Sequence, residues 1–292
     1  MALFVRFWGT RGSIPTPGFR TKRYGGNTSC VEVRTDESVF ICDGGTGLRE
    51  LGQDLIRRAT PPPMHLFFSH MHWDHIQGFP FFVPAYANHN VLSVYEIAPG
   101  QTRIRELLTG QMRSEYFPVS FCDLGAKIQS GYLEHQGKLI DGVKVRCISQ
   151  HHPGTSYAYS FEQGGKKVVY STDNELDLWL ADPNLCITSP ESLRILPSEF
   201  VDFVRNADLL IADGQYTEEE YPTRIGWGHA RTNTVVDLAV QAGVKQCAIF
   251  HHDPMQTDDD VDRKLERAEE RARRHGSHLV IFGAREGMEL KV

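Results

Sequence analysis

The feature that most constrains this chain is a short segment rich in side chains that bind metal ions, Ser69-His70-Met71-His72-Trp73-Asp74-His75. It follows the apolar run Met64 to Phe68, whose length and composition predict a buried β-strand. At a strand end the backbone leaves the pleat, so the first two histidines can turn toward one point while the Asp-His pair reaches a second. We interpret this as too many ligands for one closed tetrahedral site.

The composition is that of an ordinary globular chain, with 292 residues of which 40% are hydrophobic and 23% charged. A chain of this length can bury a large core as one or two domains. Its net charge is −6 and its isoelectric point is near 6.1. This balance disfavours a protein that holds a long polyanion, because such binding requires clustered Lys and Arg. Small anionic substrates are compatible with it, since metal ions can supply local positive charge.

The cysteines and the first residues indicate the cellular compartment. The six cysteines are widely scattered and form no Cys-x-x-Cys pair, which predicts small buried side chains in a reducing compartment. The chain reads directly into a strand without a signal peptide, and no apolar run approaches the roughly 18 residues of a membrane span. We therefore expect a cytoplasmic protein without membrane contact.

The rest of the chain alternates predicted strands with predicted helices. Alternating or apolar runs predict strands at residues 3–8, 30–34, 38–42, 91–98, 127–134, 143–149, 157–162, 166–171, 209–212, 246–250, 278–282 and 288–292. Helical spacing predicts helices at 48–58, 102–108, 232–242 and 258–275, the last with Asp258 as its N-cap. Residues 176–206 have a mixed, Pro-rich pattern, which we interpret as an excursion on the rim of the fold. With no internal repeat or linker, the elements predict one α/β domain over 1–292, a sandwich of two mixed sheets covered by helices.

Further metal-binding side chains recur where predicted strands end. These are His152, Asp173, Asp213 and His251. Because strand ends on one edge of a layered α/β fold converge, we expect these side chains to approach the opening segment. A divalent site there would draw three protein ligands per ion plus a bridging carboxylate, leaving positions for water.

The opening segment matches the H-x-H-x-D-H signature of metallo-β-lactamase-fold hydrolases, and the chain resembles that superfamily over essentially its whole length. The resemblance implies a four-layer αββα sandwich of two mixed sheets. Within the superfamily the chain resembles the phosphodiesterase branch, which includes tRNase Z and enzymes that open cyclic ribose phosphates or destroy cyclic-nucleotide signals. The stretches that carry this resemblance are Gly9 to Pro15, Gly26 to Ser29, Asp43 to Gly47, His152 to Tyr159 and Gly226 to Ala230.

The resemblance implies two divalent ions about 4 Å apart that share an activated water. It assigns the ligands of the first ion as His70, His72 and His152, those of the second as Asp74, His75 and His251, and the bridge as Asp173. The ions are expected to be Zn²⁺, with Mn²⁺ or Fe²⁺ as alternatives, because His and Asp ligands accept all three. Two doublets leave a choice: His152 is favoured over His151 because Pro-Gly follows it, and His251 over His252 because it comes first after the strand.

The same resemblance assigns roles around the metal centre. His229 matches the candidate general acid that protonates the leaving oxygen. Asp74 could act as a base or as a ligand, and we assign it to the second ion. We expect Asp43 and Asp213 to orient ligating imidazoles through their free ring N–H groups. Candidate substrate contacts are Asn27 and three aromatic residues that could stack on a base, Tyr216, Tyr221 and Trp227.

The expected substrate is a small phosphodiester, a cyclic nucleotide or a cyclic ribose phosphate. In tRNase Z a long arm that grips tRNA is inserted between the positions of His152 and Asp173, but here only the 20 residues 153–172 intervene. We therefore expect no stable nucleic-acid complex. Relatives in this branch commonly pair, so a homodimer is expected.

Other functions fit parts of the pattern. tRNA 3′ processing and thioester or lactone hydrolysis could use the same dinuclear site, although the N-terminal motifs disfavour the second. A di-iron redox protein would normally have a carboxylate where His72 stands. A protein that only binds its ligand is disfavoured by the intact set of metal-binding residues.

Overall fold

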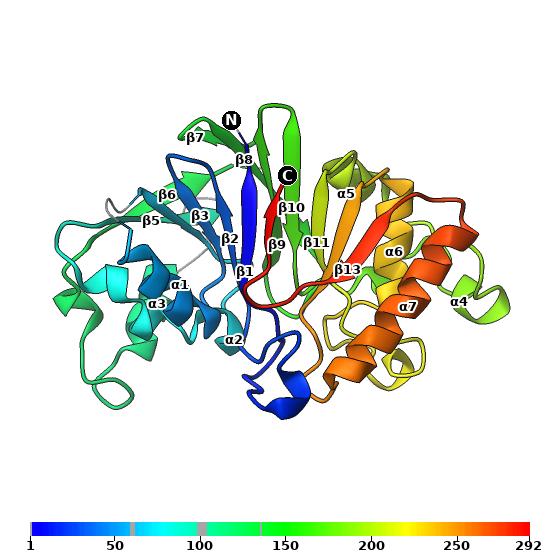
Figure 1. The fold of residues 1–292 in the computed structure, drawn as a ribbon, viewed down its shortest axis with the longest axis horizontal. Coiled ribbons are helices and arrows are strands. Elements are labelled where there is room, and N and C mark those ends of the chain that lie inside the picture. Colours follow the sequence, from blue (N-terminus) through cyan, green and yellow to red (C-terminus); the bar gives the residue numbers. More distant parts are fainter. Residues whose placement is uncertain (1, 59–61, 98–103, 135) are drawn as a thin grey trace.

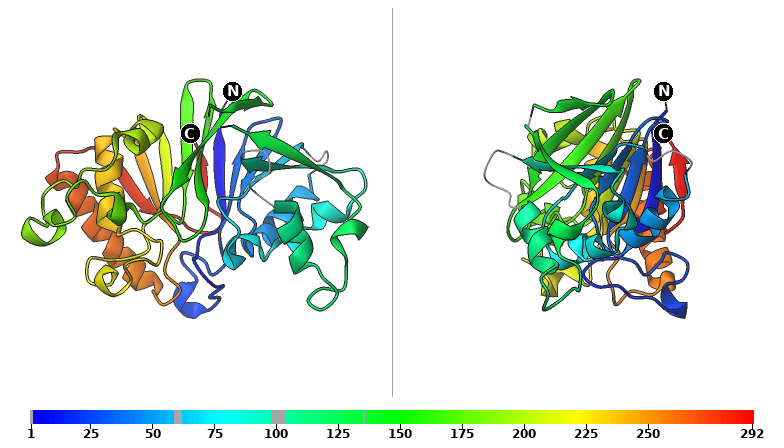
Figure 2. Two further views of the ribbon diagram at one scale, coloured as in Figure 1. Left: turned by 180° about the vertical axis from the view of Figure 1, so that it is seen from behind. Right: turned by 90° about the vertical axis from the view of Figure 1, so that its left-hand side faces the viewer.

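Two β-sheets face each other and helices cover their outer faces, which is the four-layer α/β sandwich predicted from the sequence (Figure 1, Figure 2). The computed structural model describes residues 2–58, 62–97, 104–134 and 136–292, and within these ranges each sheet has seven strands. In Figure 1 the two chain ends lie at the upper edge of the sandwich, while α2 lies at the lower edge. The predicted element bounds Ala98 and Thr102 fall outside the described residues.

The first sheet joins the N-terminal half of the chain to its last strand, in the order β14-β1-β2-β3-β4-β5-β6. Its strands are β1 Phe4–Gly9, β2 Cys30–Arg34, β3 Val39–Cys42, β4 Met64–Phe67, β5 Val91–Ile97, β6 Lys127–Leu133 and β14 Glu289–Lys291. Strands β3 to β6 run parallel to one another, whereas β1 pairs antiparallel with β2 and β14. The carboxyl ends of β3 and β4 therefore reach the same edge.

The second sheet has the order β13-β12-β11-β10-β9-β8-β7. Its strands are β7 Lys138–Ile140, β8 Val143–Gln150, β9 Ser156–Gln163, β10 Lys166–Ser171, β11 Leu209–Asp213, β12 Gln246–Phe250 and β13 Val280–Gly283. Strands β10 to β13 are parallel, and β8 to β10 form antiparallel pairs. Parallel β10, β11 and β12 deliver the chain to one edge, as the strand-end argument expected.

Apolar side chains fill the space between the sheets and the space under the helices. The inner core contains aromatic rings from both sheets, among them Phe40 and Phe67 of the first and Phe161 of the second. The α-helices are α1 Gly47–Leu55, α2 Trp73–Ile76, α3 Ile104–Gln111, α4 Leu185–Thr188, α5 Ser198–Val204, α6 Thr232–Gln241 and α7 Asp258–Arg274. On α1 the predicted spacing buries one stripe of leucines against the first sheet.

Two details differ from the sequence-based expectations. The N-cap of α7 is Thr257 rather than Asp258: Thr257 and Asp260 form a capping box, in which each side chain accepts from the other residue's backbone N–H. The Asp258 carboxylate is instead buried and accepts from the backbone N–H groups of Arg23 and Tyr24. The short elements α2, α4, α5 and β7 were not predicted, because runs of three to seven residues carry little periodicity.

The segment 176–206 connects β10 to β11 and contains α4 and α5. Its α5 packs beside α6 and buries Phe200 and Val204 in the core under the second sheet. Along the described part of the chain, every helix is too short or too polar to serve as a membrane span.

Candidate metal centre

The metal-binding side chains predicted from the sequence meet at one edge of the sandwich, where loops from both sheets converge. The segment after β4 supplies four of them from the first sheet. The loops after β8, β10 and β12 supply His152, Asp173 and His251 from the second. The two sheets therefore contribute to a single cluster.

The first half of the cluster contains three histidines, His70, His72 and His152, with one ring nitrogen of each within 4.8 Å of the others. His72 Nδ1 lies 3.0 Å from His152 Nε2. His152 Nδ1 lies 2.9 Å from the carbonyl oxygen of Gly228, which can only accept. Nδ1 therefore carries the proton, and Nε2 is left with a lone pair that faces the cluster.

The second half contains Asp74, His75 and His251, again with ligand atoms within 4.8 Å of one another. His75 Nε2 and His251 Nε2 each lie 3.2 Å from Asp74 Oδ2. His75 Nδ1 contacts the buried carboxylate of Asp43 at 2.8 Å, which directs Nε2 toward the cluster. The position of Asp43 is the one expected for a carboxylate that orients an imidazole.

Asp173 lies between the two halves. Its Oδ1 is 3.2 Å from both His75 Nε2 and His251 Nε2. Its Oδ2 is 3.6 Å from His70 Nε2 and 3.8 Å from His152 Nε2. One carboxylate oxygen therefore faces each half, which is the arrangement that a bridging ligand requires.

The residues present fit a pair of divalent ions. The Nε2 atoms of His70 and His75 are buried and have no hydrogen-bond partner in the described structure. A buried polar atom without a partner costs about 1–3 kcal/mol, and metal coordination removes that cost. Imidazole and carboxylate ligands suit Zn²⁺ and similar first-row ions.

Three residues of the site have left-handed backbone conformations at strand ends. The φ angles are 62° for Asp43 after β3, 51° for Asp173 after β10 and 56° for His251 after β12. Such angles cost non-glycine residues on the order of 1–2 kcal/mol each. Each strand ends there in a sharp turn, at which Asp173 and His251 enter the cluster and Asp43 contacts His75.

His229 lies beside the cluster and is held by Asp213, whose Oδ2 is 2.7 Å from its Nδ1. Burial alone would lower the pKa of His229, but Asp213 outweighs it and the pKa rises to about 9. We expected Asp213 to orient a ligating imidazole. Its carboxylate instead contacts the imidazole of His229, the candidate acid. Asp213 and His229 also form a group with Asp173 and His251 whose ligand atoms lie within 4.8 Å.

In each histidine doublet, the contacts of the two side chains show which one lies in the cluster. The His151 ring lies beside Trp179, and its backbone N–H donates to Asn174. His252 points its Nε2 at the carbonyl of Ala284, 2.9 Å away. Burial, followed by Lys264 and Arg11, lowers the pKa of His252 well below its usual range. The geometry brings His152 and His251 into the cluster and leaves their neighbours outside it.

The candidate substrate contacts have different environments. Trp227 is 61% exposed and accessible to a ligand. Tyr216 is 1% exposed and lies under the guanidinium of Arg224, so the expectation that it stacks on a base is wrong. Tyr221 is buried as well, and its hydroxyl donates to Glu175. Asn27 donates from both its backbone and its side chain to Glu286.

Several supporting residues were not predicted. The backbone N–H of Ser13 donates to Asp74 Oδ2 at 2.8 Å, so the Gly-rich loop after β1 holds a candidate ligand. The hydroxyl of Tyr170, from the second sheet, donates to Asp43 of the first at 2.6 Å. A Cβ on Gly228 would lie 2.1 Å from His152 Nδ1, so only glycine fits there. The sequence signal that could have indicated these contacts is the density of glycines, with Gly9 and Gly12 near Ser13 and Gly226 beside Gly228.

The Glu175 carboxylate fixes the loop that carries His229. It accepts from the backbone N–H groups of Gly226 and Gly228 and from the Tyr221 hydroxyl, each at 2.7 Å. Its own N–H donates to the carbonyl of His151 at 2.7 Å. One buried residue thus joins the loops after β8, β10 and β11 through its backbone N–H and its carboxylate.

Comparisons with known proteins agree with this arrangement. Ribonuclease Z of Haloarcula marismortui is 22% identical, covering 86% of this chain and 86% of that protein. Ribonuclease Z of Methanosarcina mazei is 26% identical, covering 88% and 90%. Both similarities therefore cover most of the chain.

Solved structures share the fold. The metallo-beta-lactamase fold protein YhfI from Bacillus subtilis superimposes with a TM-score of 0.70 at 18% identity, covering 100% of this chain and 99% of that one. The short form of human tRNase Z has a TM-score of 0.63 at 16% identity, with 98% of each chain covered. A family model described as a beta-lactamase superfamily domain matches residues 39–252, which include the whole metal-binding set. The chain belongs to the beta-lactamase superfamily.

Proposed function

We propose that the protein hydrolyses phosphodiester bonds with two divalent ions. The observation that carries the proposal is the division of the cluster into two half-sites of three side chains, joined by Asp173. His70, His72 and His152 would hold one ion, and Asp74, His75 and His251 the other. When bound, such a pair supplies positive charge for a phosphate oxygen and activates a water molecule for attack.

The side chains around the cluster have complementary tasks. Asp213 holds His229 Nδ1, so Nε2 is the nitrogen that can pass a proton to the leaving oxygen. The Nδ1 atom of His75 contacts Asp43, and that of His152 contacts the carbonyl of Gly228. Each contact fixes the orientation of its imidazole. The exposed ring of Trp227, two residues before His229, is available to contact the substrate.

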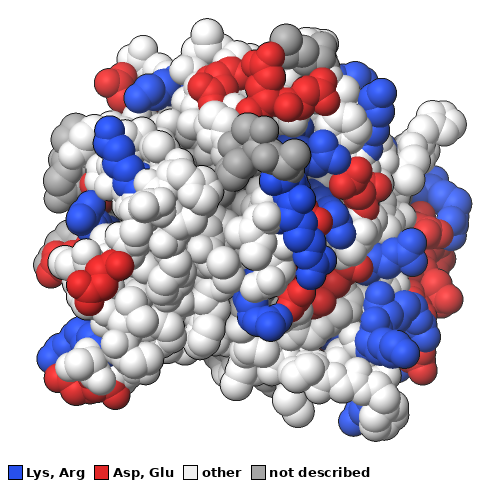
Figure 3. Space-filling view, turned by 60° about the vertical axis from the view of Figure 1, so that its left-hand side comes forward, with Lys and Arg blue, Asp and Glu red and all other residues white. Residues whose placement is uncertain are grey.

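Two substrate classes have separate support. The names of the sequence relatives favour an RNA substrate, as in tRNA 3′ processing, and they do so more directly than any observation favours a cyclic nucleotide. A small phosphodiester is supported by the tight two-residue turn between β9 and β10, where no arm is inserted. It is also supported by the net charge of −6 and by a face on which basic groups are interleaved with acidic ones (Figure 3). A homodimer and a cytoplasmic location stay predictions from the sequence.

The test is metal-dependent hydrolysis of bis(p-nitrophenyl) phosphate by protein loaded with Zn²⁺ or Mn²⁺. His70→Ala should abolish turnover, and His89→Ala, which changes an exposed histidine outside the cluster, should not. A panel of 2′,3′- and 3′,5′-cyclic nucleotides, cyclic dinucleotides and a tRNA precursor with a 3′ trailer then separates the substrate classes. Absence of metal-dependent cleavage across the whole set would refute the proposal.

A further inference from the structure

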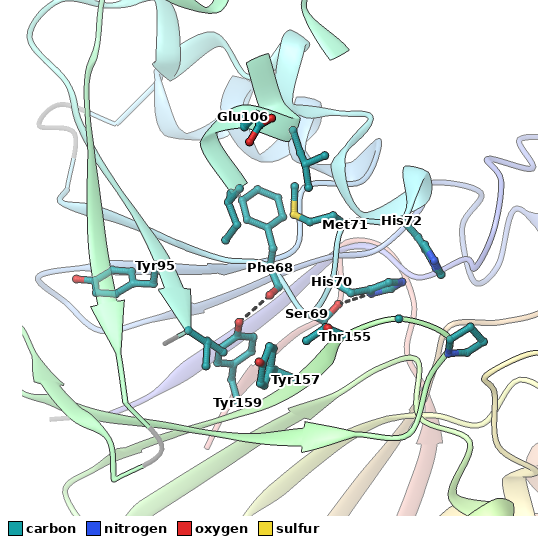
Figure 4. Close-up of a pocket in the computed structure, with 15 residues that line it drawn as sticks. Phe68, Ser69, His70, Met71, His72, Tyr95, Glu106, Thr155, Tyr157 and Tyr159 are labelled. Atoms are coloured by element: carbon teal, nitrogen blue, oxygen red, sulfur yellow. Dashed lines mark hydrogen bonds between the residues drawn. The ribbon is translucent and has the colours of Figure 1, made fainter. Parts of the chain in front are cut away.

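A serine hydroxyl lies behind histidines of both half-sites. Ser69 is fully buried and directly precedes His70 in the segment after β4. Its Oγ is 3.1 Å from His70 Nδ1, a contact drawn as a dashed line in Figure 4, and 3.4 Å from His75 Nδ1. Because His70 belongs to the first half-site and His75 to the second, this one hydroxyl is close to a candidate ligand of each ion.

The carboxylate of Asp43 determines where the proton of this hydroxyl points. Asp43 Oδ1 accepts from the backbone N–H of Ser69 at 2.7 Å, and Asp43 Oδ2 lies 2.8 Å from Ser69 Oγ. A serine hydroxyl has one proton to donate. The carboxylate is charged and lies closer to Ser69 Oγ than His70 Nδ1 does, so it takes that proton. Ser69 therefore donates to Asp43 and offers the lone pairs of its oxygen to the imidazole.

The Ser69 hydroxyl in turn determines which nitrogen of His70 carries a proton. An oxygen whose own proton is already donated can only accept from the ring, so the proton of His70 lies on Nδ1. The other nitrogen, Nε2, is buried, has no hydrogen-bond partner in the described structure and lies 3.6 Å from Asp173 Oδ2. Its lone pair therefore faces the cluster, which is the tautomer that a metal ligand requires.

The same carboxylate acts on His75 without an intermediate group. Asp43 Oδ2 is 2.8 Å from His75 Nδ1, and it also accepts from the hydroxyl of Tyr170 at 2.6 Å. Donors from both sheets therefore fix the position of this carboxylate, since Tyr170 belongs to β10 and Ser69 follows β4. Asp43 thus contacts one imidazole directly and reaches a second through Ser69.

We propose that Ser69 is a positioning residue of the metal centre, which relays the charge of Asp43 to His70. The inference rests on the two half-sites of the proposed function. One carboxylate then orients a ligand of each ion, so removal of the Ser69 hydroxyl affects the first ion alone, whereas removal of the Asp43 charge affects both. A serine that only fills space between the strands would not produce this difference.

The test measures Zn²⁺ binding to one half-site at a time by calorimetry. His251→Ala disables the second half-site and His72→Ala the first, so each background leaves one set of three ligands intact. In the His251→Ala background, Ser69→Ala should weaken Zn²⁺ binding at least about 10-fold, whereas in the His72→Ala background it should change binding by less than about threefold. Asp43→Asn should weaken binding at least about 10-fold in both backgrounds. Asparagine tolerates the left-handed backbone at this position, where φ is 62°.

Ser38→Ala is a matched control for the loss of a buried hydroxyl. The Ser38 hydroxyl donates to Asp141 at 2.6 Å, and the same carboxylate oxygen lies 2.8 Å from a ring nitrogen of His65. The substitution therefore removes the same kind of hydrogen bond outside the metal-binding groups, and Zn²⁺ binding should be unchanged in both backgrounds. Ser69→Thr, which keeps the hydroxyl, should restore the affinity of the first half-site to within about threefold of that with serine.

The tautomer of His70 gives a second readout, which needs no variant. Nitrogen-15 NMR of histidine-labelled wild-type protein loaded with Zn²⁺ should show the His70 proton on Nδ1 and the ion on Nε2. An ion on Nδ1, equal weakening of both half-sites in Ser69→Ala, no weakening of the first, or no recovery in Ser69→Thr would each overturn the inference. The titrations contain no substrate. If the half-sites respond as expected but no diester is cleaved, the proposed function fails while the role of Ser69 stands, and absence of Zn²⁺ binding to the wild-type protein would refute both.

Discussion

The Nδ1 atom of His229 and the Oδ2 atom of Asp213 lie 2.7 Å apart in a buried pair beside the metal-binding cluster. Asp213 thereby fixes which ring nitrogen faces the cluster and raises the pKa of the imidazole to about 9, against the effect of burial. His229 is thus protonated near neutral pH, the state that an acid requires. We therefore expect the pair to serve proton transfer rather than metal binding.

Replacing His229 with Ala should lower kcat by about 10²–10⁴, the usual contribution of a general acid, while two metal ions per chain are retained. A substrate with p-nitrophenolate as its leaving group, which needs little protonation, should lose much less. The measurement is kcat on both types of substrate, together with the number of metal ions per chain in the same preparation. Loss of metal from the variant would instead identify His229 as a ligand, as its group with Asp173, Asp213 and His251 would allow.

Replacing Glu175 with Gln should weaken the site without any direct contact with the substrate. One side-chain oxygen would become an NH₂ group facing a backbone N–H of Gly226 or Gly228, so a hydrogen bond is lost and the loop moves. Because the carbonyl of Gly228 holds His152, affinity for the first ion should fall about 10–100-fold. Metal titration measures this, with Tyr221→Phe, which removes one hydrogen bond to the same carboxylate, as the milder control. Unchanged affinity in Glu175→Gln would exclude this positioning role.

The predicted strands were largely correct because their apolar content was continuous: β10 and β12 have the bounds expected at 166–171 and 246–250. The meeting of the candidate ligands at one edge could be predicted because strand ends converge in this architecture, whereas their assignment to two ions came from the family resemblance. The contact between Asp213 and His229 could not be predicted, since it depends on how the loop 214–231 folds back. That loop has no periodic pattern: Tyr216 contacts Arg224 within it, and the distant Glu175 accepts from the Tyr221 hydroxyl.

Stability should rise in alkaline solution through Lys264, a buried lysine on α7. Its ammonium contacts the carbonyl of Gln215 and the side chain of Gln256, and burial lowers its pKa to about 8. Nearby charges that act on it are those of Glu220, Asp253, Asp213 and Arg11. Below pH 8 both folded and unfolded chains hold the proton. Between about 8 and the unfolded value of about 10.5 only the unfolded chain does, so the free energy of unfolding should increase by about 3 kcal/mol across that window.

The measurement for Lys264 is urea denaturation from pH 7 to 10.5 of the wild-type protein and of Lys264→Met. The variant lacks the titrating amine, so the difference in unfolding free energy between the two proteins should change with pH in the direction that favours the wild type. A difference that stays constant with pH would show that the amine does not lose its proton in the folded state.

Removing metal should destabilise the protein, because the histidine nitrogens of the cluster would lose the ions that they bind. An ion present at 100 times its dissociation constant stabilises the folded state by about 2.7 kcal/mol, so chelation followed by dialysis should lower the melting temperature. Returning Zn²⁺ should restore it in the wild type and in His89→Ala but only in part in His75→Ala. A melting temperature that does not respond to chelation would contradict a metal role for the cluster.

The two half-sites take their side chains from both sheets, since His70 to His75 follow β4 and His152, Asp173 and His251 follow strands of the other sheet. A folding intermediate with only one sheet formed could present no complete set of three. Full occupancy by two ions would then require the sheets to have docked in register. Metal content per chain would thus count the correctly assembled molecules in a preparation, and it offers a simple assay for misfolded material.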